Sequence, residues 1–252
     1  MGADSLICEI DDYDLPAFTG LIAGFGSERY GYVVTPNVDH LIRYRKDPAF
    51  RAVYRSAQYS ILDSRVVARA VRLMKGTRIA VCTGADLTAA LLSHVVSPDD
   101  RILLVGASAS QAEALATKFA LRNVRHHDPP LGLLADPQAI ERCLKFIEDE
   151  GPFRFCFLAL GSPQQEIIAH QLQSRGRARG LVLCVGAALK FLVGAEKRAP
   201  RWLQQLSLEW LFRLWQDPRR LAGRYLVRGP RIFGYLLRNR VVLHKRHPAS
   251  LA

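Results

Sequence analysis

Two short polar stretches combine residue types that could act on a hydroxyl or a phosphate. Thr35 and Asn37 stand in TPNVDH directly after an apolar run, and Asp63 follows the next such run in ILDSRVV. A carboxylate at the end of a buried strand could take a proton from a hydroxyl as a general base. Helix capping is the other interpretation, because Asn37 or Asp39 could cap one helix and Asp63 or Ser64 the next. These residues alone leave both interpretations open.

Two further turns could receive the anionic part of a ligand. Gly84 and Asp86 lie in TGAD, and Gly106 and Ser108 lie in GASAS, each before a helical pattern. Small residues let backbone N–H groups approach a phosphate at a helix N-terminus. GASASQ has one glycine where the dinucleotide fingerprint GxGxxG needs three, and no P-loop lysine follows. The turns therefore predict a nucleotide site that lacks the usual signatures of NAD or ATP.

A third turn, GSPQQE, places Gln165 and Glu166 in the first turn of a helix that begins near Pro163. These amide and carboxylate groups exceed what capping requires, and they could bind the polar edge of a base or sugar hydroxyls. The alternative is a solvated first turn in which the helix dipole favours Glu166. Both interpretations stay open.

No set of side chains predicts a metal centre or a covalent nucleophile. Asp12 and Asp14 form a DxD pattern, but Asp14 precedes Pro16 and is better explained as a helix cap. His126 and His127 lack further ligands at metal spacing, and no GxSxG occurs. We therefore expect a metal-independent protein without a cofactor.

A sheet must position these turns, and apolar runs do alternate with helical patterns through most of the chain. Expected strands are 6–10, 31–35, 58–62, 78–82, 101–105, 124–127, 154–160 and 181–185. Expected helices are 14–24, 37–55, 64–74, 86–95, 109–121, 136–149 and 163–175. The alternation predicts an α/β fold, with a mostly parallel sheet and helices on both faces. Ligands bind such sheets at the carboxyl ends of the strands, where all these turns fall.

The C-terminal part of the chain differs in composition. Strand signals stop near residue 196, so we expect two domains, 1–195 and 196–252. The net charge of the chain is +12, and residues 196–252 hold 13 Lys and Arg against three acids, together with all three tryptophans. Residues 200–216 predict one helix. A helical chain beyond it would align a cationic stripe of Arg220, Arg224, Arg228, Arg231 and Arg238.

Apolar side chains such as Leu226, Phe233 and Leu237 accompany that stripe. A basic amphipathic helix with aromatic residues fits an anionic membrane surface, and guanidinium groups also bind diphosphates. A nucleic-acid arm is the competing interpretation, which the rich apolar face and the lack of a nucleic-acid-binding signature disfavour. We expect residues 196–247 to bind a membrane, with no nucleic acid as partner.

The cysteines and the apolar runs indicate in which cellular compartment the protein works. The five cysteines are widely spaced without a CxxC, which predicts reduced thiols in the cytosol. The N-terminus has no signal-peptide pattern. The nearest candidate for a membrane span, 181–195, contains Lys190 and falls short of the ~20 apolar residues required.

Taken in order, several stretches resemble the WecG/TagA/CpsF glycosyltransferases, also known as glycosyltransferase family 26. They lie between about residues 5 and 228 and read TPNVDHL, ILDSRVV, TGADL, LLVGAS, DPPLG, LALGSPQQE and VGAALKFLVGAEKRAPRWLQQLSLEWLFRLWQDPRRLAGRYL. The resemblance implies a Rossmann-like α/β core with a helical C-terminal appendage that contacts the membrane and completes the active site.

The resemblance also implies an activity and a location. Such an enzyme transfers a sugar from a UDP-sugar to a polyprenyl-diphosphate-linked acceptor with inversion, as a peripheral protein on the cytoplasmic face of the bacterial inner membrane. Thr35 and Asn37 match the family's active-site turn, Asp63 its proposed catalytic base, and Gln165 and Glu166 its PxQE segment. Its appendage arginines correspond to Arg213, Arg220 and Arg224, which we expect to bind the acceptor diphosphate or to offset the charge that develops on departing UDP. The donor would lie on Gly84, Asp86, Gly106, Ser108, Gln165 and Glu166.

Two positions depart from the family pattern. Ser64 stands where the family usually has glycine, and Lys190 stands where it usually has an acid. The donor sugar therefore stays open among a hexose, an N-acetylhexosamine and a uronic acid. The acceptor sugar, the linkage and the oligomeric state, with a homo-oligomer as one option, stay open as well. The alternative function is a non-catalytic nucleic-acid- or lipid-binding protein on an α/β scaffold. An NAD-type oxidoreductase is disfavoured because its glycine fingerprint is absent.

Overall fold

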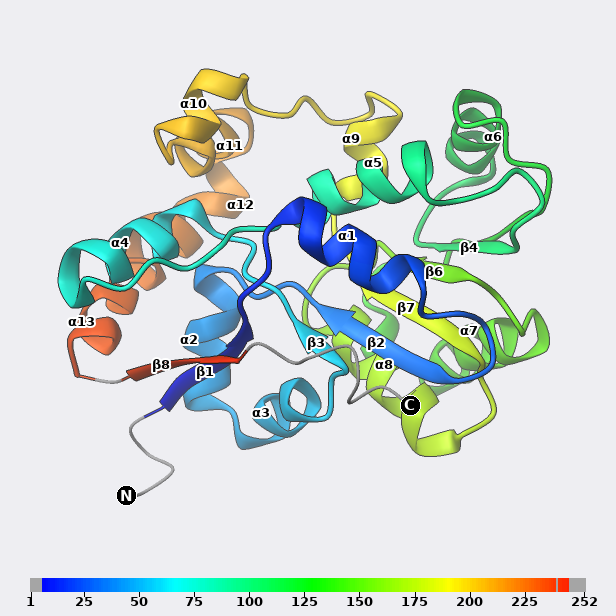
Figure 1. The fold of residues 1–252 in the computed structure, drawn as a ribbon, viewed down its shortest axis with the longest axis horizontal. Coiled ribbons are helices and arrows are strands. Elements are labelled where there is room, and N and C mark those ends of the chain that lie inside the picture. The colour runs from blue at the N-terminus through cyan, green and yellow to red at the C-terminus, as the bar shows by residue number, and fades with distance from the viewer. Residues whose placement is uncertain (1–5, 239, 245–252) are drawn as a thin grey trace.

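A six-stranded sheet organises the chain in the computed structural model, which describes residues 6–238 and 240–244 (Figure 1). For residues 6–8, 220, 240–242 and 244 it describes the backbone alone. The strand order is β3-β2-β7-β6-β4-β5, and every neighbouring pair is parallel. The strands are β2 (Tyr30–Val34), β3 (Tyr59–Ser60), β4 (Ile102–Val105), β5 (Val124–His127), β6 (Phe155–Leu158) and β7 (Gly180–Cys184). The predicted α/β fold is confirmed.

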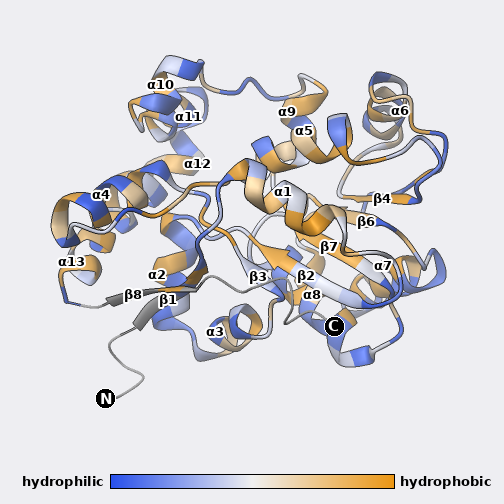
Figure 2. Cartoon of the chain, in the orientation of Figure 1, coloured by the Kyte–Doolittle hydropathy of each residue, from blue (hydrophilic) through white to orange (hydrophobic). Residues whose placement is uncertain are grey.

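Helices cover both faces of the sheet. One face carries α1 (Leu15–Ala23), α5 (Gly84–His94), α6 (Ala109–Lys118) and α9 (Ala188–Leu192). The other carries α2 (Val38–Lys46), α3 (Pro48–Arg55), α4 (Arg65–Lys75), α7 (Pro137–Asp149), which the 3-10 turn η2 (Leu133–Ala135) precedes, and α8 (Gln164–Arg175). Alternate strand residues enter opposite layers, so that Tyr32 and Val34 join one buried cluster and Val33 the other. Figure 2 shows the resulting hydrophobic strands at the centre.

Two of the expected strands, 6–10 and 78–82, do not belong to the six-stranded sheet. The first, β1 (Leu6–Asp11), lies outside the main sheet and pairs in parallel with β8 (Arg240–His244). Residues 78–82 form no strand; the Ala80 N–H donates to the Asp12 carboxylate (2.8 Å) and the Cys82 N–H to the Leu62 carbonyl (3.0 Å). Because β8 follows the C-terminal helices, the expectation that strand structure stops near residue 196 was wrong.

Two predicted helices are each divided in the structure. The helix expected over 37–55 stops at Lys46, because Asp47 is extended and its side chain caps α3 through Ala49 and Phe50. The helix expected over 200–216 divides into α10 (Arg201–Gln205) and α11 (Glu209–Gln216). Between them Ser207 has a φ of 65°, a left-handed conformation that ends a helix.

The chain then continues through α12 (Pro218–Ala222), the π-helix η3 (Gly223–Arg228) and α13 (Arg231–Arg238). The predicted arginine stripe is therefore distributed over α12, η3 and α13, with a break at 229–230. Ile232 and Leu236 of α13 are buried in the main hydrophobic cluster, where α13 packs against α4 and α2. The division into domains at residue 195 stays a prediction. No helix in the described part of the chain is long and apolar enough to cross a bilayer.

Candidate active site

The ends of β2 and β7 and the start of α5 meet at Thr35. Its side chain is buried, and its hydroxyl donates a 2.8 Å hydrogen bond to the Cys184 carbonyl at the end of β7. Gly84 approaches so closely that an added Cβ would lie 3.4 Å from the backbone of Val185 and 3.6 Å from Thr35 Oγ1. The Thr35 hydroxyl therefore holds together the strand ends that surround the candidate site.

Asn37 caps α2 and also contacts the C-terminal helices. Its Oδ1 accepts from the backbone N–H groups of Asp39 (3.1 Å) and His40 (3.5 Å), which confirms the capping interpretation. The same oxygen accepts from Arg224 Nη2 at 3.3 Å. Within the described part of the chain the Asn37 NH₂ group has no partner, so it is free to donate to a ligand.

His40 holds the turn at Asn37 in place from inside the protein. Its Nδ1 lies 2.9 Å from the Tyr54 hydroxyl, and the ring also hydrogen-bonds the Thr35 backbone. Burial, followed by the charge of Arg224, lowers the pKa of His40 to about 3. The imidazole is therefore neutral at neutral pH and acts as a fixed structural link between the turn and α3.

Asp63 is not used as a helix cap. Ser64 takes that role, because its Oγ accepts from the Val67 N–H at 3.2 Å and begins α4. The half-buried Asp63 is held through its backbone N–H, which donates to the Pro36 carbonyl (2.9 Å). Its carboxylate accepts a hydrogen bond from the Gly84 N–H at the start of α5. The carboxyl group is thus positioned at the edge of the sheet where ligands bind.

Residues from the C-terminal part of the chain set the electrostatics of Asp63. Burial raises its pKa to about 7, and the charge of Glu209 contributes to that rise, whereas Arg213 and Arg198 oppose it. Glu209 and Arg213 stand one turn apart on α11, and the Arg213 guanidinium lies 5.4 Å from the Phe191 ring centroid. A carboxyl group that titrates near neutral pH can accept a proton from a hydroxyl and later release it.

Asp86 holds Arg198 close to this carboxyl group. Arg198 Nη1 lies 2.6 Å from Asp86 Oδ1, and its Nη2 donates to Thr83 Oγ1 at 3.2 Å. Thr83 in turn donates to Asp86 Oδ2 at 2.8 Å, and Arg65 Nη2 lies 3.6 Å from the same oxygen. Burial alone would raise the pKa of Asp86, but the hydrogen bonds from Arg198 and Thr83 outweigh it and lower that pKa. Asp86 is therefore an anion whose oxygens are occupied by side chains.

Gly106 and Ser108 lie further along the same edge. Gly106 has a φ of 88°, and a Cβ there would lie 2.9 Å from the Ala159 carbonyl oxygen, so glycine is required. Ser108 caps α6 through a capping box with Gln111. Three strand spacings separate β4 from β2, which is about 14 Å. No hydrogen bond or ion pair of the described structure joins either residue to the group around Asp63.

Gln165 and Glu166 are buried, with exposed fractions of 2% and 0%, so the interpretation as a solvated first turn was wrong. Gln165 Oε1 accepts from the Gly186 N–H (3.0 Å), and its Nε2 donates to Glu166 Oε1 (3.1 Å). Burial raises the pKa of Glu166, and the Gln165 hydrogen bond opposes that shift. Gln165 thus supports the turn after β7 from inside the protein, and Glu166 holds the Gln165 amide.

Of the three predicted appendage arginines, two reach the turns described above. Arg213 acts on Asp63, and Arg224 Nε lies 3.8 Å from Asp39 in addition to its bond with Asn37. The side chain of Arg220 lies outside the described residues.

Comparison with known families decides the class of protein. A sequence model of the WecG/TagA/CpsF family of glycosyl transferases matches residues 4–246, nearly the whole chain. The chain belongs to this family. It is therefore a glycosyltransferase of a family that acts in cell-surface polysaccharide synthesis. Because the match extends through α13 and β8, the C-terminal helices of this glycosyltransferase belong to the part of the chain that the family model covers.

Two residues that influence Asp63 were not predicted from the sequence of this glycosyltransferase. Arg198 and Glu209 had contributed only to the charge balance of the C-terminal segment. A signal was present for Glu209, which is one of three acids among the 13 Lys and Arg of residues 196–252. Lys190, the departure from the family pattern, has its Nζ 3.7 Å from Glu196 Oε1.

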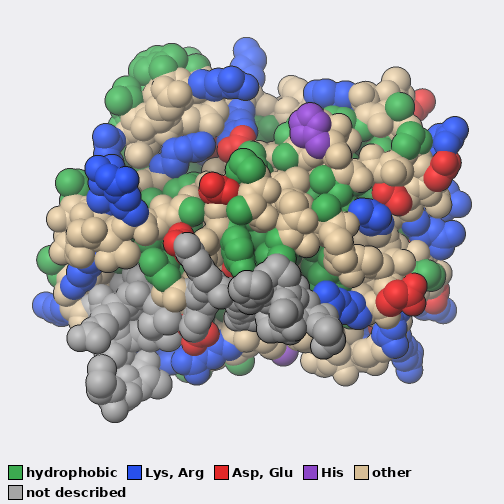
Figure 3. Space-filling model, in the orientation of Figure 1, with side chains coloured by type: hydrophobic (Ala, Val, Ile, Leu, Met, Phe, Trp, Pro, Cys, Tyr) green, Lys and Arg blue, Asp and Glu red, His purple; other side chains and the backbone are tan. Residues whose placement is uncertain are grey.

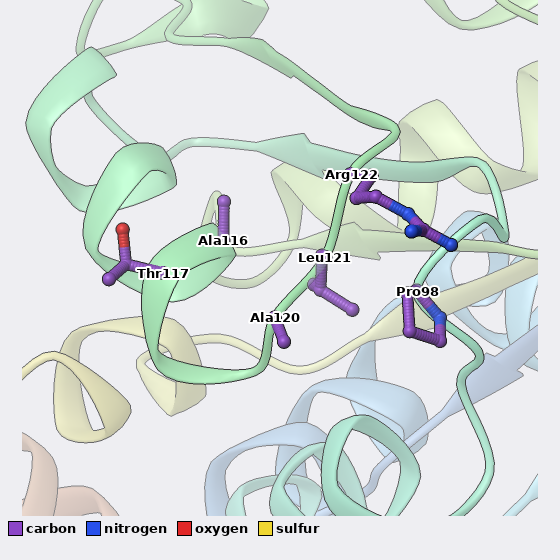
Figure 4. A pocket seen from close by; sticks show the side chains of 6 residues that line it. All are labelled: Pro98, Ala116, Thr117, Ala120, Leu121 and Arg122. Atoms are coloured by element: carbon purple, nitrogen blue, oxygen red, sulfur yellow. The ribbon is translucent and has the colours of Figure 1, made fainter.

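A hollow elsewhere on the glycosyltransferase carries no catalytic groups. It is lined by Pro98, Ala116, Thr117, Ala120, Leu121 and Arg122 (Figure 4). It lies beside the segments that precede β4 and β5, at the edge of the sheet opposite to Asp63. Its charged residue, Arg122, is paired with Asp99. In the described chain no three His, Cys, Asp or Glu residues are grouped as metal ligands would be.

Proposed function

We propose that this glycosyltransferase moves a sugar from a UDP-sugar to a polyprenyl-diphosphate-linked saccharide, in one displacement that inverts the anomeric configuration and needs no metal. The observation that supports this most is the carboxyl group of Asp63. It has a pKa near 7, a hydrogen bond from an α5 N–H group, and two arginines within electrostatic reach. A general base and cations for a departing anion are thus present together.

In the proposed step Asp63 takes the proton from the acceptor hydroxyl while that oxygen forms a bond to the anomeric carbon of the donor. The bond from the anomeric carbon to the β-phosphate oxygen breaks, and its electron pair leaves with UDP. The Asn37 NH₂ group would donate to a sugar hydroxyl, and Thr35 would keep the two strand ends in position.

The negative charge that develops on UDP requires positive partners in a site without a metal. Arg198 and Arg213 both act on Asp63, so both guanidinium groups lie near the reacting centre. Asp86 keeps Arg198 oriented through the 2.6 Å contact. We assign these two arginines to the leaving diphosphate, because preorganised charges stabilise a transition state more than mobile ones.

The donor nucleotide would lie along the strand ends from Gly84 and Asp86 to Gly106 and Ser108. The separation of about 14 Å between β2 and β4 suits an extended nucleotide sugar. Gln165 and Glu166 would act on this site through the turn at Gly186, which Gln165 holds.

The acceptor and the membrane would be bound by residues 196–247, which belong to the proposed second domain. Arg224, at the Asn37 turn, and Arg220 would receive the acceptor diphosphate. Exposed apolar side chains of these helices, among them Trp202, Trp215 and Leu226, would enter the interface of an anionic bilayer. We place the enzyme on the cytoplasmic face of the inner membrane, where UDP-sugars are available.

A transfer assay tests this function. We expect UDP release from one of a panel of UDP-hexoses, UDP-N-acetylhexosamines and UDP-uronic acids, and that release should require a short-chain polyprenyl-diphosphate-linked sugar. The product anomer, determined by NMR, should be inverted relative to the donor, and EDTA should not lower the rate. Release of no UDP with any donor, together with salt-sensitive binding to DNA or RNA, would instead support the alternative of a non-catalytic binding protein.

The pH dependence of the reaction provides a second prediction. Since the base form of Asp63 is required, kcat/KM should rise with pH through a pKa of about 7. Glu209→Gln removes a negative charge that raises this pKa, so the acidic limb should move to lower pH. An acidic limb that stays in place in this variant would mean that another group limits the rate. Glu113→Gln on α6 is the matched control and should leave the profile unchanged.

A further inference from the structure

Helix α4 of the core has an unusual solvent face. Val67, Ala70 and Val71 are buried, whereas Arg69, Arg72, Leu73 and Lys75 are exposed, and Leu73 has an exposed fraction of 80%. From residue 64 to residue 79 there is no acid. Arg72 has no ion pair in the part of the chain that the structure describes. An isolated exposed leucine needs no explanation, but Leu73 stands beside cations that have no acidic partner in the described chain, which fits a specific kind of surface.

Helix α13 lies against α4 and shows the same combination. Lys75 Nζ donates to the Leu237 carbonyl at 3.0 Å. While Ile232 and Leu236 point into the core, Phe233 and Leu237 are exposed, Leu237 to 62%. Arg231 and Arg238 are exposed at the two ends of the helix. The two helices therefore present one continuous surface of apolar and basic side chains.

This surface continues into α10 and α11. Arg69 Nη1 donates to the Leu206 carbonyl at 3.0 Å, directly after α10. Trp202 and Trp215 are exposed on these helices, Trp215 to 79%. Figure 3 shows basic side chains over α4 and hydrophobic side chains over α10 and α11 at the same end of the molecule. The exposed residues of the C-terminal helices thus form one face together with a core helix.

We propose that α4 belongs to the membrane-docking surface and that its partner is an anionic phospholipid bilayer. The contacting residues of this α4–α13 face are Arg69, Arg72, Leu73, Lys75, Phe233 and Leu237. The proposal rests on the membrane association stated above and extends it from residues 196–247 to the catalytic core. Basic side chains bind anionic headgroups, while leucine and phenylalanine enter the acyl boundary. Phosphate contacts alone would not require exposed leucine side chains such as Leu73 and Leu237 beside the basic residues.

Docking through α4 would also fix the distance between the bilayer and Asp63. The helix begins at Arg65, two residues after Asp63, and its 11 residues extend about 16 Å. A bilayer that binds α4 therefore lies at a fixed, short distance from the proposed base. The acceptor diphosphate, which is anchored in the same bilayer, would be held at that level.

Vesicle binding by the full-length protein tests the proposal. The variant Arg72→Gln/Leu73→Ser changes two exposed side chains that make no hydrogen bond or ion pair in the described structure. We expect the partition coefficient of this variant onto phosphatidylcholine vesicles containing phosphatidylglycerol to fall about fiftyfold. Loss of the cation should contribute a factor of about five and loss of the leucine a factor of about ten. Thermal unfolding should be unchanged, since neither residue is in the core.

The matched control is Arg177→Gln/Leu131→Ser, which also removes an exposed arginine and an exposed leucine. Leu131 follows β5 at the sheet edge opposite to β3, and Arg177 follows α8, so neither is next to α4. This control should bind vesicles like wild type. Equal binding by the α4 variant would overturn the inference and leave docking to the C-terminal helices alone. Failure of wild type itself to bind would remove the membrane part of the proposed function, and the α4 face with it.

Discussion

Replacing Asp63 by asparagine is expected to lower kcat by about 10²–10⁴-fold, the typical effect of removing a general base. Asparagine keeps the size of the side chain but accepts no proton at neutral pH. The KM for the donor should change much less, because Asp63 is proposed to act on the acceptor hydroxyl. Steady-state rates of UDP release over a range of donor concentrations, at saturating acceptor, measure both parameters.

Stability distinguishes this effect from misfolding. The pKa of Asp63 rises from 3.8 in the unfolded chain to about 7 in the fold, so the ionised form destabilises the protein as pH increases between those values. An asparagine side chain carries no such cost, and the Asp63→Asn variant should unfold at the same or a higher temperature than wild type at neutral pH. Asp99→Asn, at an exposed position, is the control and should retain full activity. An Asp63→Asn protein as active as wild type would remove Asp63 from the role of base.

Replacing Arg198 by glutamine is expected to lower kcat by about 10²–10³-fold, comparable to the loss of one preorganised group that stabilises transition-state charge. Arg198 also lowers the pKa of Asp63, so the acidic limb of the pH profile should move to higher pH. This direction is opposite to that expected for Glu209→Gln. Arg198→Lys should recover part of the rate, because it restores the charge without the fork of the guanidinium.

A structural role for Arg198 must be separated from a role in the reaction. Its loss leaves Asp86 without the 2.6 Å partner that keeps its pKa low, which should lower the unfolding temperature. The double variant Arg198→Gln/Asp86→Asn removes both charges and should recover that stability. If it also recovers the transfer rate, Arg198 serves to neutralise Asp86 and does not bind the leaving diphosphate. We expect stability to return while the rate stays low.

Local sequence determined the elements and most of their ends. The runs 102–105 and 155–158 are rich in apolar residues that suit a buried strand, and they form β4 and β6. Asp14 and Asn37 cap the helices that follow them, because a short polar side chain satisfies N–H groups only two or three residues away. The turns at Thr35 and Asp63 were located in the same way, from strand ends followed by helix starts.

Tertiary structure decided how the site residues are used. The pairing of β1 with β8 joins the two ends of the chain, and no local pattern in residues 6–11 encodes it. Gln165 and Glu166 resemble a solvated first turn in sequence, yet the loop after β7 buries them. The proton affinity of Asp63 depends on its burial and on Glu209, Arg213 and Arg198, which approach it only when the C-terminal helices fold back onto the core. Electrostatic interactions depend on distance through space, so the sequence could identify the carboxyl group while the fold alone determined where it titrates.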